Sequence, residues 1–142
     1  LATSSAASDV YKRQGKNIGL KDILLRKIKH SNKKNCNERK QEETKKLLEH
    51  IEKGSLNILL DRKGLKFNSL EFSKYIFDES NFTQNIIFFI GGSDGVDRKY
   101  YKKFDNIISF GDLTWPHMMF KMMLLEQIYR SVTIINKHPY HK

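Results

Sequence analysis

The sequence predicts an α/β fold with a mainly parallel sheet and flanking helices, and three observations support this prediction. The runs LNILLD and NIIFFI are short and continuously apolar, which is typical of strands buried on both faces. Segments with helical apolar spacing separate such runs, and strands that alternate with helices form parallel sheets. A length of 142 residues suits one domain with one core.

The first elements follow from local patterning. Leu20–Ile28 mixes alternation with β-favouring residues, so we expect a strand there. A polar loop then leads into a helix over residues 38–53, with Gly54 just beyond its end. Leu56–Asp61 is the first buried strand, and Arg62–Gly64 is expected to turn the chain.

The alternation continues through the second half of the chain. Residues 68–80 begin with Asn and Ser and then show near-helical apolar spacing, which predicts a helix. Residues 85–90 are the second buried strand, and 97–105 are a short basic helix. Residues 106–110 are the third strand, and 111–117 form a loop.

The longest apolar segment is Met118–Ile135, and it predicts a buried helix. Three charged residues interrupt it: Lys121, Glu126 and Arg130. It therefore lacks the uninterrupted run of roughly 18 apolar residues that spans a bilayer, so we expect no membrane partner.

The net charge of the chain indicates what kind of molecule it could bind. The 26 Lys and Arg residues against 16 Asp and Glu give +10, and the pI is about 9.7. Such a chain can displace counterions from phosphates, which favours a nucleic-acid partner. A lysine-rich solvated surface from an AT-rich genome explains the same charge. The single Cys36 excludes an internal disulfide and fits a cytoplasmic setting.

The ends of the chain need separate treatment. Leu1–Gln14 begins without Met and lacks a signal-peptide pattern, so we interpret it as a non-native leader similar to translated vector sequence. Residues 15–142 are expected to form a single domain.

Near the C-terminal end, HPYH places two histidines three positions apart. Pro139 prevents a regular helix there and no carboxylate is near in the sequence, so no metal site is expected.

Ligands of parallel α/β sheets bind beyond the carboxyl ends of the strands. Three such ends stand out: Leu60–Asp61, Gly91–Gly95 and Phe110–Trp115. Glycines let the backbone approach a ligand closely, although a tight strand-to-helix turn is the simpler explanation of such a pattern taken alone. The GGSDG pattern is neither a P-loop nor the dinucleotide-binding fingerprint.

Two long segments resemble the RlmH-type large-subunit ribosomal RNA methyltransferases of the SPOUT superfamily. They read ILLDRKGLKFNSLEFSKYI and FFIGGSDGVDRKYYKKFDNIISFGDLTWPHMMFKMMLLEQIYRSVTIINKHPYHK. The motifs LD-x-x-G, IGG-x-x-G, S-x-x-x-x-T-x-PH, EQ-[IVL]-YR and HPYHK occur in this order between Leu56 and Lys142.

The resemblance implies a C-terminal trefoil knot, a homodimer and S-adenosylmethionine as cofactor. It further implies methylation of N3 of a pseudouridine in 23S ribosomal RNA, on the large ribosomal subunit or the assembled ribosome. Two alternatives stay open: a non-catalytic RNA-binding fragment, and a SPOUT methyltransferase that acts on transfer RNA.

The resemblance also assigns residues. Its cofactor contacts fall on Leu60, Gly91, Phe110, Gly111, Asp112, Leu113, Thr114 and Trp115. The catalytic candidates, by position, are His117, Tyr140 and His141. The expected RNA contacts are Arg98, Lys99, Lys102, Lys103, Arg130 and His138, for which a solvated basic face is the alternative.

Two departures from the family pattern accompany these assignments. The family's first strand, VGK-like turn and first helix have no counterpart before Leu20, so the domain is expected to lack them. Lys121 stands where the family usually has Arg; the lysine keeps the charge but loses the bidentate fork.

Overall fold

The computed structural model describes residues 23–83 and 85–142. The predicted leader, residues 1–14, lies outside the described residues. The chain divides into two compact units, which we describe separately. The sheet unit comprises Arg26–Lys66 and Ser80–Leu113, and the helical unit contains Phe67–Glu79 and Thr114–Lys142.

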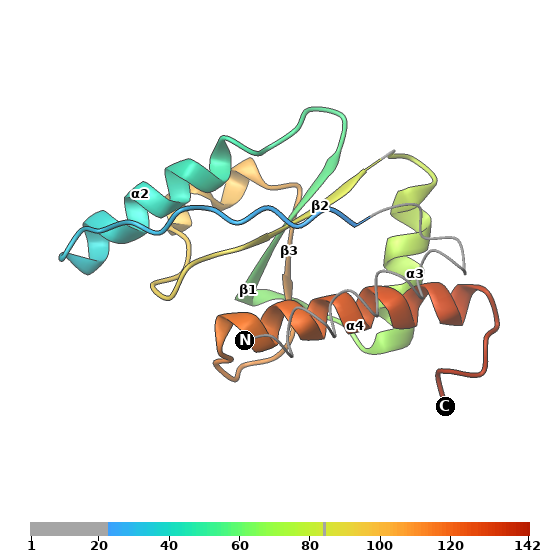
Figure 1. Ribbon diagram of the computed structural model, residues 1–142. Coiled ribbons are helices and arrows are strands. Elements are labelled where there is room, and N and C mark those ends of the chain that lie inside the picture. The colour runs from blue at the N-terminus through green and yellow to red at the C-terminus, as the bar shows by residue number, and fades with distance from the viewer. Residues whose placement is uncertain (1–22, 84) are drawn as a thin grey trace. The chain divides into compact units, whose positions relative to one another are not determined.

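The described residues of the sheet unit form three strands, one α-helix and one short 3₁₀ helix, and Figure 1 shows their arrangement. Along the chain they are α2 (Cys36–Leu48), β1 (Leu56–Lys66), β2 (Ile86–Ile90), the 3₁₀ helix η1 (Arg98–Lys103) and β3 (Asn106–Ser109). The helical unit holds α3 (Ser69–Ser80) and α4 (His117–Ile135).

The described strands form a parallel sheet in the order β2-β1-β3, which confirms the predicted α/β class. The central strand is the most buried, with all five residues from Leu56 to Leu60 inaccessible, as its continuous apolar run predicts. In β2, at the edge, only Phe89 is buried. The core around this sheet consists of Leu47, Leu59, Phe89, Val96 and Phe104.

Helix α2 begins and ends at identifiable signals. The side chain of Asn35 accepts hydrogen bonds from the amides of Asn37 and Glu38, which caps the first turn. The helix ends at Leu48, five residues before the predicted end, because the amides of His50 and Ile51 bond to carbonyls only three residues back. Gly54, with φ +87°, lies in the turn before β1 and not directly behind the helix.

The strand predicted over Leu20–Ile28 is wrong in its described part. Residues 23–28 have no regular secondary structure, and residues 20–22 lie outside the described range. Leu24 and Leu25 are exposed by 73% and 43%. The apolar pattern alone does not make a strand here, because a strand also needs a neighbour for its backbone hydrogen bonds.

The turn predicted at Arg62–Gly64 does not end β1, which continues to Lys66. Leu60 and Leu65 both pair with Ile108, so the residues between them form an irregularity within the strand. A Cβ on Gly64 would lie 2.6 Å from backbone atoms of Ile107 and Ile108, so the two strands approach too closely there for any side chain.

In the helical unit, α3 and α4 are joined by polar contacts. The Asn68 side chain accepts the Glu71 amide and the Glu71 carboxylate accepts the Asn68 amide, at 2.9 and 2.8 Å; this capping box starts α3 as predicted. The Ser73 hydroxyl donates to the Ser131 carbonyl at 3.0 Å. Ser131 lies on α4, so this bond ties the two helices together.

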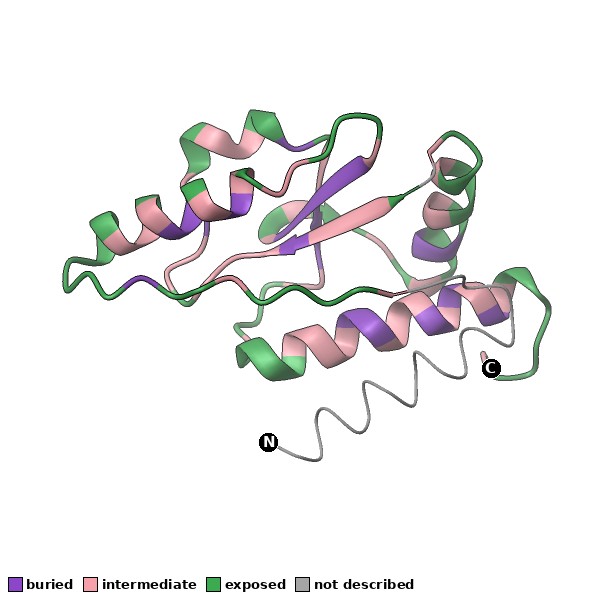
Figure 2. Ribbon diagram, turned by 45° about the horizontal axis from the view of Figure 1, so that its top comes forward, coloured by how far each residue is buried: buried purple, intermediate pink, exposed green. Residues whose placement is uncertain are grey.

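Helix α4 is buried along one stripe only (Figure 2). Leu124, Leu125 and Tyr129 are buried, whereas Met118 and Met119 in the first turn are 38% and 50% exposed. The predicted buried helix is therefore an amphipathic one. None of the helices in the described ranges is long and apolar enough to cross a membrane.

Candidate cofactor site and polar networks

The sheet register brings three predicted strand ends together. Leu60 on β1 pairs with Ile90, the last residue of β2, and with Ile108 on β3. Gly91 directly follows Ile90, and Phe110 is two residues beyond Ile108. The sheet register therefore places Leu60, Gly91 and Phe110 near one another at the same end of the sheet. These are three of the positions that the resemblance assigns to the cofactor.

The loop from Gly91 to Gly95, here called the glycine loop, is a tight turn after β2. The Gly95 amide donates to the Gly92 carbonyl at 3.0 Å, and Gly95 has φ +75°, which favours glycine. Gly91 does not have a positive φ; a Cβ there would lie 2.9 Å from Cγ2 of Val96. Crowding against Val96, and not backbone conformation, therefore requires glycine at position 91.

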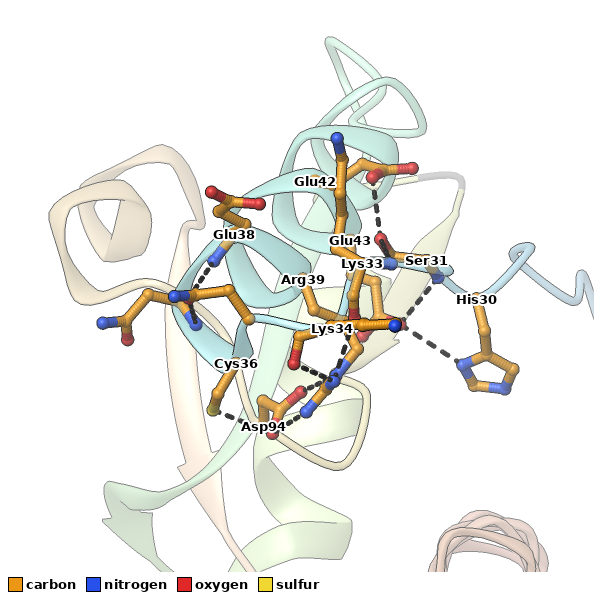
Figure 3. A network of polar contacts seen from close by, with 12 residues as sticks. His30, Ser31, Lys33, Lys34, Cys36, Glu38, Arg39, Glu42, Glu43 and Asp94 are labelled. Atoms are coloured by element: carbon orange, nitrogen blue, oxygen red, sulfur yellow. Dashed lines mark hydrogen bonds and ion pairs between the residues drawn. The ribbon is translucent and has the colours of Figure 1, made fainter.

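One end of the glycine loop is anchored to α2 through Asp94 (Figure 3). Arg39 forms a bidentate ion pair with this carboxylate, through Nε and through Nη2, the latter at 3.0 Å. The Cys36 thiol donates to Asp94 at 3.1 Å. The hydrogen bonds from Arg39 and then Cys36 lower the pKa of Asp94 to about 2.

The same contact raises the pKa of the Cys36 thiol, chiefly through its hydrogen bond to Asp94. The thiolate is the reactive form of cysteine, so this environment disfavours reactivity. Cys36 is thus a structural contact of the glycine loop.

Glu43 lies one helical turn after Arg39 and is only 6% exposed. Its Oε1 accepts the Ser31 amide at 3.0 Å and lies 3.5 Å from Nδ1 of His30. Its Oε2 has no hydrogen-bond partner among the described residues. A Cβ on Gly92 would lie 2.1 Å from Oε2, so the carboxylate fills the space that a side chain at position 92 would take.

Sequence reasoning missed Arg39, Glu43 and Asp94 as parts of this site. A signal was present: Arg39 and Glu43 are four residues apart and therefore share a helix face. Thr44 on that face also accepts the Asp97 amide, at 3.1 Å, just after the loop. The sequence did not reveal that this face meets the glycine loop, because the contacts join residues 49 to 55 positions apart.

The loop after β3 begins with local hydrogen bonds. The Ser109 hydroxyl accepts the Gly111 amide and donates to the Gly111 carbonyl, both at 3.1 Å, and Gly111 has φ +109°. Asp112 pairs with Lys66 at 2.6 Å, and Leu113 is 68% exposed. This loop therefore presents an apolar side chain beyond β3, as a ligand-binding wall requires.

The last two assigned cofactor positions, Thr114 and Trp115, belong to the helical unit. Thr114 is exposed. Nε1 of Trp115 is buried without a hydrogen-bond partner among the described residues. An indole N–H usually has a partner when it is buried, so this one has an unused donor.

The predicted basic patch lies on a single short 3₁₀ helix. Arg98, Lys99, Lys102 and Lys103 all lie on η1 and are all exposed. Lys99 pairs with Asp97 at 3.2 Å and lies over the Tyr100 ring, whose centroid is 5.1 Å from Nζ. Tyr101, also on η1, forms a hydrogen bond to Asp61, the residue that follows Leu60, so η1 lies beside β1. Burial, together with this hydrogen bond, raises the pKa of Tyr101.

The C-terminal tail folds back onto α4. The Tyr140 hydroxyl donates to Glu126 at 3.2 Å, and the Tyr140 ring packs edge-on against Tyr129 at 4.9 Å. Arg130 pairs with the same Glu126 and contacts Nδ1 of His141 at 3.2 Å. The structure thus brings Tyr140 and His141 together with Arg130, and it adds Glu126, which the sequence did not single out.

These contacts fix hydrogen-bond roles. A guanidinium only donates, so Nδ1 of His141 is the acceptor in this contact. His117 lies exposed in the first turn of α4, thirteen residues before Arg130, or about 20 Å along the helix. The three predicted catalytic residues therefore form two separate groups. The predicted RNA contact His138 is exposed beyond the helix end.

Comparisons with known proteins agree with the resemblance seen in the sequence. A family model described as predicted SPOUT methyltransferase matches residues 2–141. A protein of Rhizobium etli named ribosomal RNA large subunit methyltransferase H is 34% identical over 135 residues, covering 94% of this chain and 84% of that protein. A protein of the same name from Mycoplasmopsis synoviae is 46% identical over 118 residues, covering 83% of this chain and 77% of the relative. The chain therefore belongs to the SPOUT methyltransferase family.

Proposed function

We propose that this protein methylates ribosomal RNA of the large subunit, at N3 of a pseudouridine, with S-adenosylmethionine as methyl donor. The observation that carries the proposal is the similarity over 84% of the Rhizobium etli protein, whose name states methyl transfer to that RNA. Membership of the family makes the protein a methyltransferase, which requires a methyl donor. The donor's identity and the modified atom are the proposed parts.

The sheet unit offers features that suit a donor of this kind. Leu60, Gly91 and the loop over residues 110–113 lie at one sheet edge, and the resemblance extends the set to Thr114 and Trp115. The close approach at Gly91 and Gly92 leaves backbone and no side chain at the loop surface. An unpartnered oxygen of Glu43 behind Gly92 adds negative charge, which suits a cation. S-adenosylmethionine, when bound, supplies a methyl group on a positively charged sulfur.

The residues of this chain then have to position the acceptor and receive a proton. Holding two reactants in near-attack geometry is worth roughly 7–11 kcal/mol, so no metal or covalent intermediate is needed. N3 of a pseudouridine carries a proton that must leave, which calls for a base within hydrogen-bond reach. His117 fits this role. Tyr140 gives its only proton to Glu126, so its hydroxyl can accept from the RNA and its ring can stack on a base, and Arg130 holds His141 beside it.

The basic residues of η1 have the character of a phosphate-binding surface. Their side chains are exposed. The helix that carries them lies beside β1, because Tyr101 on η1 forms a hydrogen bond to Asp61 on β1. Backbone phosphates of RNA are bound by such cations without base specificity. Arg130 on α4 and His138 in the C-terminal tail are proposed as further RNA contacts within the helical unit.

We also propose that two copies of the chain form a homodimer. Met118 and Met119 are exposed on α4, and Met122, Met123 and Ile128 are only half-buried, so one helix face retains unburied apolar surface. Methionine suits adaptable interfaces. Light scattering should report twice the mass of the 16.7 kDa chain, and a stable monomer that still methylates RNA would contradict the dimer.

The deciding experiment is methyl incorporation from labelled S-adenosylmethionine. Whole ribosomes, purified 23S RNA and transfer RNA are offered in parallel, and calorimetry measures donor binding separately. We expect donor binding and label in large-subunit RNA only, at a pseudouridine located by mass spectrometry. Label in transfer RNA would favour the other SPOUT activity, and RNA binding without donor binding would favour a non-catalytic module.

A further inference from the structure

A buried carboxylate behind the glycine loop has no function in the site as the family resemblance assigns it. Glu43 is 6% exposed, and its Oε2 lacks a hydrogen-bond partner among the described residues. The same oxygen is 2.1 Å from the position of a Cβ on Gly92, so it touches the loop's backbone. Buried polar atoms nearly always have a partner in native proteins, and each exception requires an explanation.

The charge of Glu43 is poorly compensated within the described ranges. The Ser31 amide donates to Oε1, and among the described residues the only ionisable side chain within ion-pair distance is the imidazole of His30, at 3.5 Å and with a 64% exposed side chain. Arg39, one helical turn away, is committed to Asp94 (Figure 3). A buried charge without a close partner is destabilising, unless a cation binds near it.

The proposed methyl donor brings such a cation. S-adenosylmethionine has a positively charged sulfonium, whereas the product S-adenosylhomocysteine has a neutral thioether at the same place. The two molecules otherwise differ only by the transferred methyl group. A negative charge directly behind the loop therefore stabilises the donor complex more than the product complex, and a low-polarity setting strengthens the effect.

We infer that Glu43 is a specificity-determining residue of the methyl-donor site, whose charge favours the cationic donor over its neutral product. The inference rests on the proposed function and names one residue that acts in it. Glu43 lies behind Gly92, so it acts through the loop and does not itself react. The Arg39–Asp94 pair anchors the other end of the same loop and keeps the carboxylate and the loop surface together.

Calorimetric titration of the full chain with each molecule tests this inference. Glu43→Gln keeps the shape of the side chain and removes its charge. We expect this variant to bind S-adenosylmethionine about tenfold more weakly, the order of effect of one nearby charge at an effective dielectric constant near 20, and S-adenosylhomocysteine nearly as well as before. The matched control is Glu42→Gln, which removes the neighbouring carboxylate that pairs with Lys46; we expect both affinities to stay unchanged.

The ratio of the two affinities decides the result. Equal weakening of both molecules in Glu43→Gln would show a purely steric role and would overturn the inference, as would no change in either. Binding of neither molecule by the unaltered protein would overturn the proposed function and this inference with it.

Folding of each variant is checked by circular dichroism. If Glu43→Gln is unfolded, Glu43→Met is the second neutral variant, because replacing a buried charge with an apolar group is often tolerated. The same selective loss is expected from it. If every neutral replacement unfolds the chain, Glu43 is structural and the inference is wrong.

Discussion

Oε2 of Glu43 lies 2.1 Å from the point where a side chain on Gly92 would begin. The helix α2 and the glycine loop are therefore in van der Waals contact at this point, 49 positions apart in sequence. The carboxylate takes the place of a side chain, and its Oε1 is held by the Ser31 amide at 3.0 Å. Glycine at position 92 follows from packing, since its φ is not positive.

Gly92→Ala should destabilise the protein, because the added methyl group and the Glu43 carboxylate cannot occupy the same space. We expect a loss of about 1–3 kcal/mol in the free energy of unfolding, the usual cost of overpacking, measured by urea denaturation. Glu43→Asp withdraws the carboxylate by one methylene group. The double variant should therefore lose less than the sum of the two single changes, and simple additivity would contradict the contact.

Gly64→Ala tests the close approach of β1 and β3. A Cβ there would lie 2.6 Å from three backbone atoms of Ile107 and Ile108, which cannot move aside as a side chain can. We expect a loss of about 3 kcal/mol by urea denaturation, at the upper end for overpacking. The control is Gly54→Ala, where no atom lies within 4 Å and only the φ of +87° opposes the change; it should cost about 1 kcal/mol. Equal losses would argue against the strand contact.

Asp94→Asn tests the anchor between the glycine loop and Arg39. The pKa of Asp94 is lowered from 3.8 to about 2, so its ion pair stabilises the folded protein fully above about pH 4. This contribution should decline as the pH falls from about 4 through 2, because the carboxylate becomes protonated in both states only below the folded-state pKa. Unfolding curves at several pH values should show that the variant is less stable than the unaltered protein at pH 7, with the difference shrinking below pH 4. A constant difference would exclude the ion pair as its cause.

Lys137→Gly should stabilise the end of α4. Lys137 has φ +52°, and its amide and that of His138 bond to the carbonyls of Ile134 and Thr133, which is the Schellman ending that favours glycine. We expect a gain of about 0.5 kcal/mol by thermal or urea unfolding. The neighbouring Asn136 has φ −85°, so Asn136→Gly is the control and should destabilise. A loss of stability in both variants would contradict this reading of the turn.

Deletion of Pro139–Lys142 should abolish methylation of ribosomal RNA and leave donor binding intact. The deletion removes Tyr140 and His141, which contact Glu126 and Arg130 on α4 and which we propose to face the RNA. Labelled methyl transfer and calorimetry give the two readouts. Deletion of the exposed Lys142 alone is the control and should keep activity. Full methylation by the longer deletion would remove the tail from the proposed mechanism.

Sequence patterns alone determined the α/β class and most of the elements. Continuous apolar runs predicted β1 and β2, because a strand covered on both faces has no polar side, and the alternation of strands with helices predicted β3. The Asn68–Ser69 start predicted the beginning of α3, since the hydrogen bonds by which Asn68 caps the helix are local. The motifs from Leu60 to His141 also led to the family that the comparisons confirmed. The trefoil knot implied by that family stays a prediction.

Tertiary structure decided what depends on residues far apart in the chain. Leu20–Ile28 had an alternating pattern, yet its described residues form no strand, because strand pairing requires a neighbour that local sequence does not specify. The continuation of β1 through Gly64 depends on the approach of β3, more than forty residues later. Glu43, Arg39 and Asp94 read as ordinary surface charges in the sequence. Only the packing of α2 against the glycine loop buries Glu43 and pairs the other two, because burial and ion pairing are properties of the folded neighbourhood.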